Sequence, residues 1–165
     1  MDSTHRFSLP LLHPGQAQKE TFHNEALQRL DLLVAATVEG PPSSDPPASP
    51  LHGQCYIIGA DPTGAWAGHA GELAGYTAGG WRFARPTQGL TAYVVSSGTF
   101  ATYRGGVWQI GTVEAERLVV AGQQVIGPRV AAISQPVGGA IVDAEARSSI
   151  GSILAALRAH GLIES

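Results

Sequence analysis

A duplicated pattern of glycine and aromatic residues constrains this chain more than any other feature. Residues 71–81 (GELAGYTAGGW) align with residues 98–108 (GTFATYRGGVW), so that Gly, Ala, Tyr, Gly and Trp recur in register. Each copy follows an apolar segment that begins at a glycine, Gly53 in the first copy and Gly89 in the second. Because aromatic and β-branched residues favour a pleated, half-buried surface, each copy predicts one strand followed by a hairpin.

The turns and arms of the two predicted hairpins match each other. Gly79–Gly80 and Gly105–Gly106 supply the positive φ angles that tight hairpins require. Aromatic residues on opposite arms are placed to pair across each hairpin, and each such pair contributes about 0.2–1 kcal/mol. The predicted pairs are Tyr76 with Trp81 and Tyr103 with Trp108. Two copies predict an aromatic β-meander over residues 51–112, built as a small sandwich or open barrel.

The segment before the meander predicts an arm, a helix and a linker. Residues 1–39 begin with an extended arm, and apolar side chains then recur at helical spacing from about Gln16 to Val38, with Gly40 as the stop. This predicted stripe consists of Phe22, Ala26, Leu27, Leu30, Leu33 and Val34, with Asp31 on the opposite face. We interpret His23, Asn24 and Glu25 as polar residues of the first turn or of an interface, in preference to a site. Residues 40–50 hold five prolines and predict a stiff, extended linker.

Residues 113–165 predict a Val-rich β segment and a C-terminal helix. Asp143 is a favourable N-cap, and Gly161 is placed to end the helix. Apolar side chains in this helix step by four, three and four residues, as in a two-heptad a/d seam. The seam predicts an oligomer contact, with packing on the sheet as the alternative, and consists of Ala146, Ile150, Ile153 and Leu157. The predicted fold class is therefore mainly β with flanking helices.

Composition excludes several classes of protein. The net charge of −3 and the 14% of charged residues include no basic stripe, so we expect no nucleic-acid partner. The single cysteine, Cys55, forms no internal disulfide and is expected in the core. No apolar run reaches the length of a membrane span, and the N-terminal residues lack the apolar region of a signal peptide.

The sequence contains little that indicates catalysis. The zinc-protease, phosphate-loop and serine-hydrolase motifs are missing, and the six histidines show no ligand spacing. We therefore expect no metal, no cofactor and no enzymatic activity. Carboxylates for a glycosidase exist, but no spacing picks out a pair among Glu72, Glu114 and Glu116. A polysaccharide-degrading enzyme is the third hypothesis.

Aromatic side chains on a rigid β scaffold are suited to stacking on sugar rings. Trp66 is the favoured residue, because it lies in an inserted turn outside the hairpin register and the core has less claim on it. Trp81 and Trp108 recur in register and are expected to contribute more to the core. The candidate carbohydrate-binding residues are Trp66, Tyr76, Trp81, Tyr103 and Trp108. A monomeric carbohydrate-binding module is the second hypothesis.

Four motifs, at residues 9–31, 53–56, 64–68 and 79–83, resemble a domain of unknown function that is common in alphaproteobacterial prophages and gene transfer agents. The opening, residues 9–31 (LPLLHPGQAQKE, then HNEAL and Asp31), is similar to the opening of that domain. The Gly-x-x-Tyr strand at residues 53–56, the GAWAG turn at 64–68 and the GGWRF hairpin at 79–83 continue the resemblance. The C-terminal pattern, from Gly127 to Ile163, is similar to the ends of phage fibre-type proteins.

The resemblance implies a viral structural protein of a phage-like particle: a head spike, a tail fibre or the base of one. Its implied partners are further copies of itself, other virion proteins of the capsid or fibre, and host capsular polysaccharide during host attachment. A trimer is favoured because fibres are usually trimers, and a pentamer is second because a capsid vertex is fivefold. The implied location is the virion, after synthesis in the bacterial cytoplasm. This is the first hypothesis.

Overall fold

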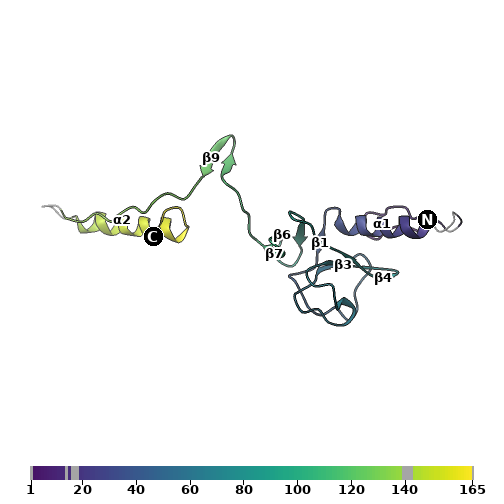
Figure 1. Ribbon diagram of the computed structural model, residues 1–165. Helices are drawn as coiled ribbons and strands as arrows, with labels where there is room; N and C mark the ends of the chain where they lie inside the picture. Colours follow the sequence, from purple (N-terminus) through teal and green to yellow (C-terminus); the bar gives the residue numbers. More distant parts are fainter. Residues whose placement is uncertain (1, 14, 16–18, 139–142, 165) are drawn as a thin grey trace. The chain divides into compact units, whose positions relative to one another are not determined.

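The computed structural model describes residues 2–13, 15, 19–138 and 143–164 (Figure 1). The chain divides into two compact units, residues 1–113 and 114–165, and each is described by itself. Among the described residues the structure is mostly β with two helices, and no sheet closes into a barrel. The predicted fold class, mainly β with an N-terminal and a C-terminal helix, is confirmed.

Each copy of the repeat forms one strand followed by a hairpin, as predicted. The first copy is a three-stranded antiparallel sheet of β2 (Cys55–Ile57), β3 (Leu73–Thr77) and β4 (Gly80–Ala84). The second copy is β5 (Thr91–Val94), β6 (Thr99–Arg104) and β7 (Val107–Ile110). A short strand, β1 (Thr37–Val38), pairs parallel with β5 and makes the second sheet four-stranded.

Both predicted aromatic pairs are confirmed. Tyr76 lies opposite Trp81 with ring centroids 4.9 Å apart, and Tyr103 lies opposite Trp108 with centroids 5.4 Å apart. The turn glycines were predicted less accurately. Gly105 and Gly106 both have positive φ, but in the first hairpin only Gly80 does. There the strands pair as far as Thr77 and Gly80, so Gly80 is the first residue of β4 and not a central residue of the turn.

The N-terminal helix is shorter than predicted. Helix α1 (Lys19–Leu33) ends four residues before β1, and Ala35 between them has a φ of +42°. The prediction that the helix continues to Val38 and stops at Gly40 is therefore wrong. Its predicted start at Gln16 lies outside the described residues.

Most of the predicted apolar stripe of α1 is exposed, although Leu33 packs against the core. Phe22 is 79% exposed and Val34 is 51% exposed, whereas Leu32 is buried against the sheet. Asp31, which was expected on the solvent face, is only 4% exposed because the N-terminal arm covers it. Polar contacts of Asp31, together with the packing of Leu32, thus orient this helix on its domain.

The N-terminal arm folds back on α1. The Thr4 hydroxyl donates a 2.7 Å hydrogen bond to Asp31, and the amides of Arg6 and Phe7 donate to the same carboxylate. The Arg6 guanidinium donates to the Ala35 carbonyl and to others at the end of the helix. Helices leave their last carbonyls unpaired, so this arginine satisfies groups that the helix cannot satisfy itself.

Two clusters form the core of residues 1–113. The larger one lies between α1 and the two sheets and contains Leu32, Val38, Cys55, Ile57, Leu73, Ala92, Val94 and Ala101, among others. The smaller one contains Ile58, Trp66 and Ala74, with Tyr56, Trp81 and Phe83 packed against it. Residues of the proline-rich segment adjoin the first sheet, where the Ser43 amide donates to the Ile57 carbonyl.

Residues 114–165 form a β-hairpin and a helix. The hairpin consists of β8 (Leu118–Val120) and β9 (Gln123–Ile126), which confirms the strand character of the Val-rich segment. Helix α2 (Ala144–Ala159) begins as predicted, with the Asp143 side chain accepting a hydrogen bond from the Ala146 amide. Gly161 follows its last turn with a φ of +68°. Within the part of the chain that the structure describes, neither helix is long and apolar enough to cross a membrane.

Candidate functional site: a charged and aromatic groove beside β4

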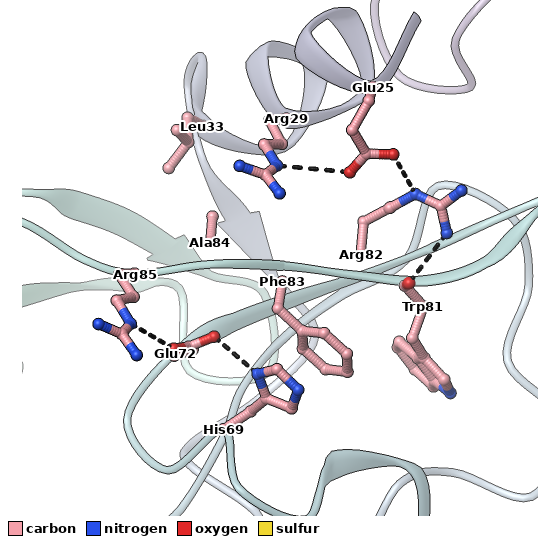
Figure 2. Close-up of a pocket in the computed structure, with 10 residues that line it drawn as sticks. All are labelled: Glu25, Arg29, Leu33, His69, Glu72, Trp81, Arg82, Phe83, Ala84 and Arg85. Carbon is pink, nitrogen blue, oxygen red and sulfur yellow. Dashed lines mark hydrogen bonds and ion pairs between the residues drawn. The ribbon is translucent and has the colours of Figure 1, made fainter. Parts of the chain in front are cut away.

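An open groove of about 710 Å³ runs beside β4, the edge strand of the first sheet (Figure 2). We call it the β4 groove. Its lining consists of Glu25, Arg29, Leu33, His69, Glu72, Trp81, Arg82, Phe83, Ala84 and Arg85. It combines charged groups of both signs with aromatic rings, which is the composition expected of a site for a polar ligand with apolar faces.

Three segments position this lining. Glu25, Arg29 and Leu33 are four residues apart on α1 and therefore share one face of the helix. Successive side chains of β4 point to opposite faces of the sheet, so that Trp81 and Phe83 join the smaller core cluster while Arg82 reaches α1. The loop that leads into β3 supplies His69 and Glu72, and Arg85 directly follows β4.

Glu25 holds two arginines. One carboxylate oxygen lies 2.8 Å from Nε of Arg82, and the other lies 3.4 Å from Nε of Arg29. Arg82 also donates through Nη1 to the carbonyls of Gly79 and Trp81. Arg82 therefore braces the β3–β4 turn, whereas Arg29 remains 60% exposed at the groove surface.

Glu72 holds the third arginine and a histidine. Its carboxylate lies 3.0 Å from Nε of Arg85 and 2.9 Å from Nδ1 of His69. Burial by itself raises the pKa of Glu72, but the hydrogen bonds and positive charges of His69 and Arg85 outweigh it, and the net pKa is lowered. Glu72 is thus a charged acceptor at neutral pH, and it orients Arg85, whose side chain is 89% exposed.

Rings line the other part of the groove. The imidazole of His69 stacks on Phe83 with centroids 3.6 Å apart and planes at 10°. Trp81 is half-buried and packs edge-on against Trp66. Figure 2 shows the His69–Phe83 stack and Trp81 on one side of β4, with Arg85 beside Glu72 on that side and Arg29 beside α1 on the other.

The structure separates the five predicted carbohydrate-binding residues. Trp66 is fully buried, so the expectation that the core has less claim on it is wrong. The short 3-10 helix η1 (Gly64–Trp66) turns this ring into the smaller core cluster, where it meets Tyr56 and Trp81. Trp81 lines the β4 groove. Tyr76 packs on the Trp81 ring but does not line that groove.

Tyr103 and Trp108 line a different hollow of about 420 Å³. The indole Nε1 of Trp108 donates a 2.9 Å hydrogen bond to the Gly71 carbonyl, and its ring packs against the larger core cluster. This hollow contains backbone and apolar groups, with Pro42 and Val107 among them. No titratable side chain other than Tyr103 lines it among the described residues.

Sequence reasoning missed most of the β4 groove. Glu25 was interpreted as a polar residue of the first turn or of an interface, and it does contact a distant strand, at Arg82. Asn24 binds both backbone groups of Leu12 in the arm. The four-residue spacing of Glu25, Arg29 and Leu33 indicates that they share one face of the helix. Nothing in the sequence indicates that this face lies beside β4.

The predicted seam of α2 is solvent-exposed. Ile150 is 42% exposed and Ile153 is 58% exposed, and the seam ends at the half-buried Leu157. Leu154, outside the seam, is the residue of α2 that is buried. The oligomer contact at this seam stays a prediction.

Residues 23–109 match a family described as "Protein of unknown function (DUF2793)". The match covers more than half of the 165 residues and includes both copies of the aromatic repeat. It also includes every lining residue of the β4 groove. No curated protein matches the chain.

Proposed function

The chain belongs to the DUF2793 family, and we propose that it is a structural protein of a phage-like particle. In this proposal several copies assemble through residues 114–165, and residues 1–113 carry a surface that contacts host polysaccharide. The particle is a gene transfer agent or a prophage-derived virion, and the protein is its spike, its fibre or the base of one. Other virion proteins of the capsid or fibre are the further partners.

The apolar surface of residues 114–165 carries this proposal. Among the described residues of that unit, two large hydrophobic side chains are buried, Leu154 and Ile163. Ten other large hydrophobic side chains of the unit are 40–58% exposed: Leu118, Val119, Val120, Val125, Ile126, Val130, Ile133, Ile150, Ile153 and Leu162. An isolated two-stranded hairpin is marginally stable in water, and a segment of this size with so small a core needs further burial. Association with other chains supplies that burial.

The helix pattern favours other copies of the same chain as the partners that cover this apolar surface. In a parallel bundle of identical helices, each seam residue meets its own counterpart. Ile150 and Ile153 are the exposed members of such a seam. A trimer is our first expectation, for a fibre, and a pentamer is the second, for a base at a capsid vertex.

The solution mass tests this proposal. We expect size-exclusion chromatography with light scattering to give three or five times the chain mass of 17.1 kDa. Ile150→Asp with Ile153→Asp is expected to dissociate the assembly, because it places charges in the apolar seam. Ala155→Asp is the matched control, since Ala155 is exposed on the opposite side of α2 and its substitution should leave the mass unchanged.

A parent protein that remains a monomer at every concentration measured would contradict the assembly proposal. The second candidate, a monomeric carbohydrate-binding module, is favoured by the β4 groove and would then take its place. The third candidate, a polysaccharide-degrading enzyme, would release new reducing ends during prolonged incubation with host capsule. We expect none to form.

A further inference from the structure

We propose that the β4 groove binds a sugar acid, a hexuronic acid residue within an acidic polysaccharide. Arg29 and Arg85 each donate to a carboxylate of the polysaccharide, Glu25 accepts from a sugar hydroxyl, and a sugar ring lies against the aromatic part of the groove. This inference deepens the polysaccharide contact of the proposed function and rests on it for the biological source of the ligand.

The arginines are arranged so that their terminal amino groups remain available. All three arginines of the groove meet their glutamate through Nε, not through the terminal Nη atoms. Arg82 uses Nη1 on the hairpin backbone, but the contacts found for Arg29 and Arg85 within the described residues involve Nε alone. Each glutamate therefore fixes one exposed guanidinium whose outer edge matches the bidentate geometry of a carboxylate.

The charge of the groove favours an anion. Its lining has three arginines and two glutamates, which leaves one net positive charge with His69 neutral. The whole chain, by contrast, has a formal net charge of −3. A local excess of positive charge on an acidic protein attracts an anionic ligand to this surface in particular.

The glutamates and the rings distinguish a sugar acid from other anions. Saccharide hydroxyls need acceptors as well as donors, and the carboxylate of Glu25, with a side chain 36% exposed, is such an acceptor. Trp81 and the His69–Phe83 stack offer apolar surface to the C–H face of a sugar ring.

Binding is best measured by isothermal titration calorimetry on the full chain with tetragalacturonate as the probe. The matched ligand is the same oligosaccharide after reduction of its carboxyl groups, and oligothymidylate tests a nucleic acid strand. We expect binding of tetragalacturonate, and at least about tenfold weaker binding of the reduced form, as loss of charge-assisted hydrogen bonds implies. Binding at equal strength to both saccharides, or stronger binding to oligothymidylate, overturns the proposal.

Two variants locate the site. Arg85→Ala and Arg29→Ala are each expected to weaken tetragalacturonate binding at least about tenfold, because both side chains are exposed and each loses a charge-assisted bond. Arg117→Ala removes an exposed arginine from the other unit and should leave the affinity unchanged. Unchanged affinity in the Arg29→Ala, Arg85→Ala double variant places the site elsewhere and overturns the proposal.

The solution mass of each preparation separates this inference from the proposed assembly. An intact oligomer that binds no acidic saccharide overturns the groove proposal and leaves the assembly standing. A monomer that binds tetragalacturonate through Arg85 supports the groove proposal and overturns the assembly.

Discussion

Glu25 and Arg82 join α1 to β4 through a 2.8 Å contact between Oε2 and Nε, although 57 residues separate them in the sequence. The contact closes one side of the β4 groove. It also holds Arg82 where its Nη1 reaches the Gly79 and Trp81 carbonyls. One partly buried arginine thus connects the helix, the edge strand and the hairpin turn.

Arg82→Ala is expected to lower the free energy of unfolding by about 1–3 kcal/mol, because it removes three hydrogen bonds and leaves Glu25 with one arginine. Arg29→Ala removes a pair that is largely exposed and should cost less than about 1 kcal/mol. Urea denaturation of both variants provides the comparison. Equal losses would mean that the contacts of Arg82 to the turn contribute nothing.

Trp66→Ala is expected to lower the free energy of unfolding by about 3–5 kcal/mol, the usual cost of removing a large buried aromatic side chain. Trp66→Phe should cost much less, since the buried indole Nε1 has no hydrogen-bond partner among the described residues. Thermal unfolding monitored by circular dichroism tests both. A Trp66→Ala variant as stable as the parent would show that this ring is not part of the core.

Stability should fall in acid through Glu72. Its folded pKa lies below the ordinary value of 4.5, so its contribution is present above that pH and is lost as the pH falls through the folded pKa. The Glu72→Gln variant should therefore show a weaker decline of unfolding free energy below pH 4.5 than the parent. His69→Ala removes one cause of the lowered pKa of Glu72. The unfolding free energy of this variant should therefore also decline less than that of the parent below pH 4.5. A Glu72→Gln profile parallel to that of the parent contradicts this linkage.

Cys55 should react slowly with thiol reagents in the folded protein. Burial is the main cause that raises the pKa of its thiol to about 11, and the thiolate is the reactive form. We expect labelling by iodoacetamide at pH 8 to be slow in buffer and to become fast in denaturing urea. Equal rates in the two conditions would show that the larger core cluster opens readily.

Local patterns determined the features that sequence analysis predicted correctly. The pairing of Tyr76 with Trp81, and of Tyr103 with Trp108, follows from two tight turns, because the turn sets the register of a hairpin. The start of α2 follows from the Asp143 side chain and a backbone amide three residues away. Each of these features needs only neighbours in the chain.

Which faces are covered depends on contacts between segments that lie far apart in the sequence. The orientation of α1 depends on Thr4 reaching Asp31 and on Glu25 reaching Arg82, contacts that span 27 and 57 residues. Trp66 is buried because an inserted turn folds over the first sheet, and the β4 groove exists because α1 lies along that sheet's edge. Hydrophobic spacing states which residues share a face of an element, but long-range polar contacts select the face that is buried.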